Sequence, residues 1–298
     1  MQFAEYAKAI RGIERQINLD TLNATRNLVL PLVVPVAMEA ANQIEVQRDI
    51  KYGSHERHRM DVFTPFSGFA PARPVLIFVH GGGFVAGDKQ MPGTQFYDNI
   101  GQWAVRNGCN AVNLTYRLAP QHQWPSGIED LHQAVHFLQQ EGKTHGIGTE
   151  NIFLMGQSAG GAHAASYVAH QKIYAPHAHG LRGLILLSGV YNYTLKPGPM
   201  EAAYLGSDQS VYAERSSLAG LVHSDVPMLV TIAECDPLYF EQQGLELLAA
   251  LQRRHGQLPR FVHMIGQNHF SVALYLGQPG DLLAPQLLNF IRDYSSPA

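Results

Sequence analysis

The stretch Asn151-Ile152-Phe153-Leu154-Met155-Gly156-Gln157-Ser158-Ala159-Gly160 decides the fold of this chain. Its apolar first half predicts a buried strand, and the small residues from Gly161 to His170 predict a helix directly afterwards. Gly156 and Gly160 allow a tight turn around Ser158, which is then held in a strained backbone conformation at a helix N-terminus. This context is typical of a serine nucleophile, and an ordinary strand-to-helix turn is the alternative.

A second glycine motif lies upstream. The apolar residues from Pro74 to Val79 predict a buried strand that runs into His80-Gly81-Gly82-Gly83-Phe84. Acyl transfer by a serine builds negative charge on a carbonyl oxygen, and backbone N–H groups must reach that oxygen without side chains in the way. A phosphate-binding loop is the alternative, but it would carry Gly-Lys-Ser/Thr or Gly-x-Gly-x-x-Gly before a helix, and neither pattern is present. We therefore interpret this segment as an oxyanion loop.

Two later strands supply partners for the serine. Apolar residues 226–233 lead into Glu234-Cys235-Asp236-Pro237-Leu238, and residues 260–265 lead into Gly266-Gln267-Asn268-His269-Phe270. A triad in the chain order Ser, Asp or Glu, His is then completed by Asp236 and His269. Glu234 competes as the acid, but it lies at the end of the strand, whereas Asp236 lies on the loop before a proline that stops helical continuation.

Position separates His269 from the other histidines, of which the chain has 15 in all. His163 lies one turn into the helix after the serine, where we expect it to pack against a neighbouring element. His263 lies inside a predicted strand. His269 is therefore the candidate base.

Two pairs of histidines have the short spacing of metal ligands, His55/His58 and His177/His179. Neither pair is accompanied by a third ligand cluster or by paired cysteines. We expect no metal, and the predicted chemistry requires no cofactor.

With Tyr116-Arg117-Leu118-Ala119-Pro120 added, the chain resembles the hormone-sensitive-lipase family of α/β-hydrolase esterases over about residues 45–295. In that family His-Gly-Gly-Gly, Tyr-Arg-Leu-Ala-Pro, Gly-Asp-Ser-Ala-Gly and Asp-Pro-Leu recur in this order. The resemblance implies a nucleophile, an orienting acid and a base, which are Ser158, Asp236 and His269. It also implies an oxyanion hole made by three backbone N–H groups, those of Gly82, Gly83 and Ala159.

Two positions depart from the family pattern. Gln157 stands where the family usually has Asp, and Asn268-His269-Phe270-Ser271 stands where it usually has His-Gly-Phe. Arylformamidase-like hydrolases and small acetyl or feruloyl esterases are also similar in the oxyanion loop and the elbow, and they vary at both positions. The resemblance therefore implies the reaction class and leaves the substrate open.

The motifs together predict a serine hydrolase that cleaves carboxylic esters of short to medium acyl chains through an acyl-enzyme intermediate. An arylformamidase or amidase with the same triad is the main alternative. A noncatalytic small-molecule receptor on a hydrolase fold is a further alternative, but such proteins usually lose a triad member, and this chain retains all three.

The composition suits one domain with a large core, since the 298 residues are 46% hydrophobic and 15% charged. A net charge of −3 gives no electrostatic case for nucleic acid or an anionic membrane, so we expect a small neutral ester as the partner. Cys109 and Cys235 lie on strands that are not neighbours in this fold, which favours a reducing compartment. Residues 1–8 lack the features of a secretory signal, so we expect a cytoplasmic protein without integral membrane association.

Short apolar stretches alternate with helical patterns, which predicts the α/β class: an α/β-hydrolase fold with a mostly parallel central sheet, flanking helices and a small helical cap. The predicted strands are Ile44–Tyr52, Arg59–Phe63, Val75–Val79, Cys109–Leu114, Ile152–Met155, Leu184–Leu187, Met228–Ile232 and Phe261–Ile265. All four motif loops follow the carboxyl end of a predicted strand, where open α/β sheets bind ligands.

We expect an amino-terminal helical cap segment at residues 1–43 and a catalytic domain at residues 44–298, with an additional cap insertion at residues 191–222. The apolar run at residues 28–38 is too short to span a bilayer, and we expect its two prolines to break it. The alternatives for the first 40 residues are cover of a sheet edge or a contact in a homodimer. Aromatic and aliphatic residues near the motifs are candidate pocket walls, with plain core packing as the alternative: Phe84, Trp124, Tyr191, Leu238 and Phe270.

Overall fold

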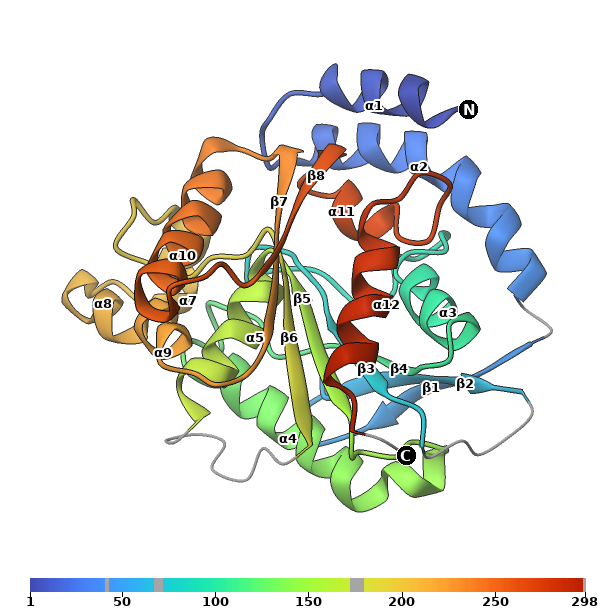
Figure 1. Ribbon diagram of the computed structural model, residues 1–298. Coiled ribbons are helices and arrows are strands. Elements are labelled where there is room, and N and C mark those ends of the chain that lie inside the picture. Colours follow the sequence, from blue (N-terminus) through green and yellow to red (C-terminus); the bar gives the residue numbers. More distant parts are fainter. Residues whose placement is uncertain (41–42, 67–71, 172–179, 297–298) are drawn as a thin grey trace.

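The computed structural model describes residues 1–40, 43–66, 72–171 and 180–296, with the side chains of residues 34–40 left aside. Its centre is an eight-stranded sheet in the order β1-β2-β4-β3-β5-β6-β7-β8 (Figure 1). The strands are β1 (Ile44–Lys51), β2 (Arg59–Pro65), β3 (Val75–Val79), β4 (Asn110–Leu114), β5 (Ile152–Gln157), β6 (Leu181–Leu187), β7 (Met228–Cys235) and β8 (Arg260–Asn268). All eight predicted strands are confirmed, with ends that differ by a few residues.

The sheet is mostly parallel, as predicted. β1 pairs antiparallel with β2 and β2 pairs antiparallel with β4, and the other neighbouring strands of the described sheet run parallel. Consecutive strand residues point to opposite faces, so Leu76 and Phe78 of β3 join one core cluster while Val75, Ile77 and Val79 join the other. Every residue of β3 is buried because helices cover both faces.

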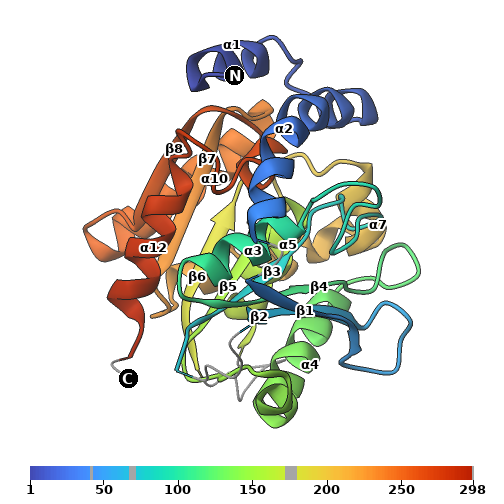
Figure 2. The ribbon, with the colours of Figure 1, turned by 90° about the vertical axis from the view of Figure 1, so that its right-hand side faces the viewer.

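The helices form two layers around the sheet (Figures 1 and 2). One face is covered by α3 (Asp98–Arg106), α11 (Ser271–Leu274) and α12 (Leu283–Tyr294). The other face is covered by α4 (Ser126–Glu141), α5 (Ala159–Ala169) and α10 (Leu238–His255), and a short 3-10 helix η1 (Gly142–His145) follows α4.

Two amino-terminal helices, α1 (Phe3–Arg11) and α2 (Leu19–Ala40), lie across the end of the molecule at which β7 and β8 finish (Figure 1). The sequence predicts that prolines break the apolar run of the second helix, and this prediction is wrong. Helix α2 continues past Pro31 and changes direction along its length (Figures 1 and 2). A proline removes one backbone hydrogen bond and crowds the preceding turn, so a helix that continues past it bends. Described residues include no helix that is both long and apolar enough to cross a membrane.

The segment between β6 and β7 contains α7 (Pro199–Leu205), the 3-10 helix η2 (Gln209–Val211), α8 (Tyr212–Arg215) and α9 (Leu218–Val222). Its tyrosines at 193, 204 and 212 are buried in a third apolar cluster together with Phe84 and Ala159. This insertion therefore packs against the glycine loop. That residues 1–43 and 191–222 form a cap stays a prediction.

The two cysteines lie at distant places in the sheet. Cys109 immediately precedes β4 and Cys235 ends β7, and the strand order puts β3, β5 and β6 between them. Both thiols are free and buried, and burial raises the pKa of the Cys109 thiol to about 11.

Candidate active site

Ser158 occupies the turn between β5 and α5 with φ 55° and ψ −121°, a backbone conformation that costs energy for a residue with a side chain. The glycines around it are required because backbones touch. A Cβ atom on Gly160 would lie 2.1 Å from the Val79 carbonyl oxygen, and one on Gly156 would lie 2.2 Å from the Gly160 carbonyl oxygen. The strand, turn and helix expected for a nucleophile elbow are thus present, and the serine stands at the positive end of the α5 dipole.

The three predicted catalytic side chains meet at the carboxyl ends of three different strands. His269 Nε2 lies 2.8 Å from Ser158 Oγ, and His269 Nδ1 lies 2.9 Å from Asp236 Oδ1. The ionised carboxylate can only accept, so Nδ1 carries the proton of the neutral imidazole and Nε2 accepts from the serine hydroxyl. Asp236 is fully buried, and Ser158 keeps only 8% of its surface exposed.

Asp236 is fixed by two further hydrogen bonds on its second oxygen. Ser188 Oγ donates to Oδ2 at 2.6 Å, and the Ala233 amide donates to it at 2.8 Å. The competing carboxylate, Glu234, turns away from the histidine and forms an ion pair with Arg11 at 2.8 Å. This hydrogen bond, helped by the Gly266 amide, lowers the pKa of Glu234.

The glycine loop passes beside the serine. A Cβ atom on Gly81 would lie 3.2 Å from Ser158 Cβ and 2.3 Å from Gln157 Oε1, so only glycine fits there. Gly82 and Gly83 follow with φ of 136° and 60°. Across the described residues no hydrogen bond uses the amide of Gly82 or Gly83.

A third amide at this site belongs to Ala159, the first residue of α5, and the first amides of a helix have no partner within it. The loop that carries the glycines is braced at its start. The His80 ring stacks on the ring of Tyr116, and the Tyr116 hydroxyl donates to the His80 carbonyl at 2.8 Å. Tyr116, the first residue of the Tyr-Arg-Leu-Ala-Pro motif, therefore supports the glycine loop.

His163 packs as predicted and does not reach the serine. Its ring makes edge contacts with Phe84, Tyr116 and Tyr204, with centroids 5.2, 4.4 and 5.0 Å away. Neither ring nitrogen has a hydrogen-bond partner in the described part of the chain. Burial among these aromatic rings lowers the pKa of His163 to about 4.

The histidine pair at 55 and 58 belongs to a polar network whose central residues, His58 and Asp130, are buried. His58 Nε2 lies 3.0 Å from Asp130 Oδ1, and the His55 ring meets the His122 ring edge to face. Among the residues that the structure describes, no group of three His, Cys, Asp or Glu side chains is arranged to hold a metal ion. His177 and His179 lie outside the described residues.

Two of the predicted pocket walls lie next to the site. Phe270 meets the His269 ring nearly at a right angle, with centroids 5.7 Å apart. Phe84 follows the glycine loop, is buried, and stacks face to face on Tyr204 at 4.7 Å. Their contact with a substrate stays a prediction.

The other three predicted walls have different surroundings. Trp124 lies under the guanidinium of Arg215 at 5.2 Å. Tyr191 is buried, and its hydroxyl accepts a hydrogen bond from the Gly189 amide. Leu238 is 65% exposed at the start of α10. Their role as pocket walls also stays a prediction.

Three residues beside the site are not among those predicted from the sequence: Phe240, Met200 and Ser188. The Phe240 ring lies 4.0 Å from the His269 ring between centroids. The Met200 sulfur lies 2.0 Å from the position that a Cβ atom on Gly83 would take. Ser188 could have been found, because it follows a predicted strand's carboxyl end, whereas no motif marks the other two.

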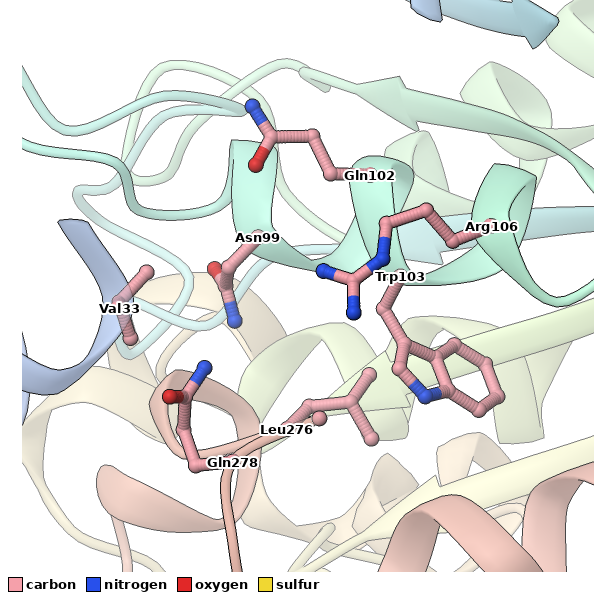
Figure 3. Close-up of a pocket in the computed structure, with 8 residues that line it drawn as sticks. Val33, Asn99, Gln102, Trp103, Arg106, Leu276 and Gln278 are labelled. Carbon is pink, nitrogen blue, oxygen red and sulfur yellow. The ribbon is translucent and has the colours of Figure 1, made fainter. Parts of the chain in front are cut away.

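Two hollows elsewhere on the molecule contain none of the predicted catalytic residues. A cavity of about 10 Å³ lies between α2, α3 and the turn at residues 276–278, and Figure 3 shows Asn99 and Gln278 facing into it. This volume suits one water molecule. An open cleft of about 370 Å³ lies among charged side chains that include Arg57, Asp88 and Lys89.

The arrangement is suited to nucleophilic attack on a carbonyl group. An imidazole held between a buried carboxylate and a serine hydroxyl can accept the serine proton and then return it to a leaving group. Amides without partners beside the serine can stabilise a developing oxyanion.

The known proteins that this chain resembles are mostly named as esterases. A family model described as BD-FAE matches residues 60–175, less than half of the chain. Esterase LipI of Mycobacterium tuberculosis is 39% identical over 93 residues, which cover 31% of this chain and 28% of LipI. Ethyl acetate hydrolase of Pseudomonas putida is 29% identical over 235 residues, 72% of each protein. Kynurenine formamidase of Danio rerio is 25% identical over 252 residues, 82% of this chain and 81% of that protein.

Coverage of the relatives differs widely, and the chain spans about a third or less of the length of the first curated relatives it matches. Solved structures align over nearly the whole chain. A bacterial heroin esterase has a TM-score of 0.71 at 20% identity and covers 98% of both chains. Esterase B from Lactobacillus rhamnosis has a TM-score of 0.71 at 17% identity, covering 91% of this chain and 96% of its own. Together with the sheet order, these likenesses show that the chain has the α/β-hydrolase fold.

Proposed function

We propose that this chain is a serine esterase that hydrolyses carboxylic esters through an acyl-enzyme intermediate, with Ser158 as nucleophile, His269 as base and Asp236 as the orienting acid. One observation carries the proposal: a continuous hydrogen-bonded chain runs from the buried Asp236 carboxylate through His269 to the hydroxyl of a serine with positive φ. Structural packing alone explains neither the strained serine nor the buried carboxylate, because both cost folding free energy.

In the first half of the reaction His269 Nε2 takes the Ser158 proton while Oγ attacks the ester carbonyl carbon. The carbonyl π electrons move onto oxygen, where the amides of Gly82, Gly83 and Ala159 donate hydrogen bonds. His269 then gives its proton to the departing alcohol oxygen, and the acyl group stays on the serine. Water repeats the sequence and releases the carboxylic acid, while Asp236 stabilises the imidazolium at each stage.

The substrate proposed is a neutral ester with a short to medium acyl chain. Phe240 on one side of His269 and Met200 over Gly83 bring apolar surface to both ends of the site. Ethyl acetate hydrolase, whose name gives a short ester as its substrate, aligns with most of the chain. The order of the four motifs supports membership of the hormone-sensitive-lipase family, and a cytoplasmic location stays part of the proposal.

Hydrolysis of an N-formyl arylamine by the same triad is the second candidate. It is favoured by the alignment with kynurenine formamidase, which extends over more of this chain than the alignments with the two esterases. For an amide His269 must protonate the leaving nitrogen, which is a poorer leaving group than an alcohol oxygen. The two candidates therefore differ in the second proton transfer and share the first.

The test compares p-nitrophenyl acetate, butyrate and hexanoate with N-formylaniline, using the wild-type protein and Ser158→Ala. We expect ester turnover in the wild type, its loss in Ser158→Ala with an unchanged melting temperature, and labelling of Ser158 by an organophosphonate. Labelling of another serine, or substantial ester turnover in Ser158→Ala, would contradict the proposal. A larger kcat/KM for the formamide than for every ester would favour the second candidate.

A further inference from the structure

The loop that carries His269 is fastened to the amino-terminal helices at three consecutive residues. Gly266 lies against α1, because a Cβ atom there would be 2.7 Å from Ala7 Cβ. The Gln267 side chain accepts a hydrogen bond from the Tyr6 hydroxyl at 2.9 Å. The Asn268 side-chain amide donates to Thr25 Oγ1, on α2, at 2.8 Å. Contacts between residues more than 240 positions apart in the sequence thus hold the three residues directly before His269.

Asn268 connects both sides of His269. Its side-chain Oδ1 accepts from the main-chain amides of Phe270 and Ser271 at 3.2 and 3.0 Å. The main-chain amide of Asn268 donates to Ser271 Oγ at 2.8 Å. These bonds close the turn around the histidine. They require that the oxygen of the Asn268 side chain, and not its nitrogen, faces the turn.

Thr25 selects this orientation of the Asn268 side chain. The Thr25 hydroxyl donates its hydrogen to the Thr21 carbonyl at 2.8 Å, so toward Asn268 it can only accept. An acceptor at this point binds the NH₂ end of the amide and leaves Oδ1 for the turn. Thr25 is fully buried and Asn268 nearly so, so no solvent competes for these groups.

The main chain of His269 is also held by Gln157, the residue of β5 directly before Ser158. The Gln157 side chain donates to the His269 carbonyl at 2.8 Å. The main chain of His269 is therefore clamped between β5 and α2, and only the α2 side depends on the amino-terminal segment.

We propose that Thr25 is a positioning residue, which acts through Asn268 to hold His269 where its ring bridges Ser158 and Asp236. The inference rests on the proposed function, for it assigns the amino-terminal helices a part in the same proton transfer. An imidazole that moves on its loop keeps its chemistry and loses alignment, so the effect falls on kcat rather than on substrate binding.

The experiment replaces the hydroxyl with a methyl group in Thr25→Val and restores it in Thr25→Ser. Thr21→Val is the matched control, because Thr21 is a buried threonine on the same helix whose hydroxyl, among the residues that the structure describes, bonds only within residues 16–21. With p-nitrophenyl acetate we expect Thr25→Val to lower kcat by about tenfold with little change in KM. Thr25→Ser should return kcat close to the wild-type value, and Thr21→Val should leave it unchanged.

A second readout does not depend on turnover. The Nδ1 proton that His269 shares with Asp236 gives a low-field proton resonance, assigned by its absence in His269→Ala. We expect Thr25→Val to shift or broaden this resonance and Thr21→Val to leave it in place. If Thr25→Val is insoluble, Thr25→Ala is judged by the same two measurements.

Unchanged kcat in Thr25→Val, or an equal fall in Thr21→Val, would overturn the positioning role. The failure of the proposed function looks different, because the wild-type protein would then turn over none of the esters. In that case the resonance alone decides, and an unaltered signal in Thr25→Val overturns the inference.

Discussion

The serine side and the histidine side of the site are held in place in different ways. Around Ser158, glycines let β3, β5 and α5 touch backbone to backbone, and the residues concerned lie in two short motifs. His269 lies at the end of β8, the edge strand, whose outward residues Phe261 and Ile265 are 38% and 40% exposed. Its support comes from Tyr6 and Thr25, far away in the sequence. The serine side is held by contacts within two short motifs, whereas the histidine side is positioned by residues far away in the sequence.

Segments from different parts of the chain pack against the two halves. The insertion between β6 and β7 packs on the glycine loop, whereas α1 and α2 pack on the ends of β7 and β8 (Figure 1). A change on the serine side should therefore act through backbone strain, and a change on the histidine side should act through alignment.

The largest effect is expected from the histidine itself. His269→Ala removes the proposed base and should lower kcat for p-nitrophenyl acetate by three or more decades, on the order of 4 kcal/mol. His163→Ala, on the serine side, removes a ring packed among Phe84, Tyr116 and Tyr204 and should act mainly on stability. Steady-state kinetics and thermal melting of both variants provide the check. Equal losses of kcat at unchanged melting temperature would refute the separation of the two histidines.

Backbone contact on the serine side predicts the next largest effect. Gly160→Ala puts a Cβ atom 2.1 Å from the Val79 carbonyl oxygen, and because that neighbour is backbone in a central strand it cannot swing aside. We expect a loss of about 3 kcal/mol in the free energy of unfolding, measured by urea denaturation.

Gly12→Ala is the matched control for that substitution. It follows α1, has negative φ, and its Cβ atom would come no closer than 3.3 Å to the Ala9 carbonyl oxygen. We expect little change in its free energy of unfolding. If the two alanine variants were equally stable, backbone contact between α5 and β3 would not be what holds the serine side in place.

The same contrast explains how far the sequence could be interpreted. The strands β3 to β8 were predictable because each contains a short apolar run between turn residues, which a strand packed inside the sheet needs, whereas β1 mixes polar and apolar residues and is partly exposed. Ser158, Asp236 and His269, which the structure brings together, each follow such a strand, so topology alone sends them to one end of the sheet.

What lay beyond prediction depends on contacts between distant residues. Phe240, Met200 and Thr25 occupy no motif, and their places are decided by how α10, the insertion and α2 pack. The course of α2 also differs from the one that the sequence predicts, because a proline disfavours but does not forbid a helix that tertiary contacts stabilise. Val29 and Val33, on either side of Pro31, are buried in the core cluster that also contains residues of α3 and α11, and this tertiary packing favours continuation of the helix past the proline.

Acid should weaken the serine side in particular. Burial lowers the pKa of His163 to about 4, below the ordinary value near 6.5, and burial likewise lowers the pKa of His80 to about 3. Between pH 6.5 and pH 4 the unfolded chain binds a proton at position 163 that the folded protein excludes, so the free energy of unfolding falls as pH falls. His163→Phe removes this proton and should reduce the loss between pH 7 and pH 4.5 by about 2 kcal/mol.

Urea denaturation at the two pH values checks this prediction. His263 on β8 is exposed, so His263→Phe is the control from the histidine side and should leave the pH dependence as it is. An identical pH dependence in wild type and His163→Phe would mean that position 163 is not the site of acid sensitivity.

The smallest effect, a change in preference for acyl chain length, distinguishes the insertion between β6 and β7 from the amino-terminal helices α1 and α2. Met200 places its sulfur over Gly83 from the insertion, and the residue is 37% exposed, so its flexible side chain can be displaced at low cost. Met200→Ala should raise the ratio of kcat/KM for p-nitrophenyl hexanoate over acetate by roughly fivefold, less than a fully enclosed methylene contact would give. Thr25→Val should lower both rates together and leave that ratio unchanged, because it acts on the base and not on the acyl chain. Leu238→Ala shows whether the exposed leucine predicted as a pocket wall meets the substrate at all. If the ratio responded to Thr25→Val and not to Met200→Ala, the amino-terminal helices and not the insertion would form the wall of the acyl site.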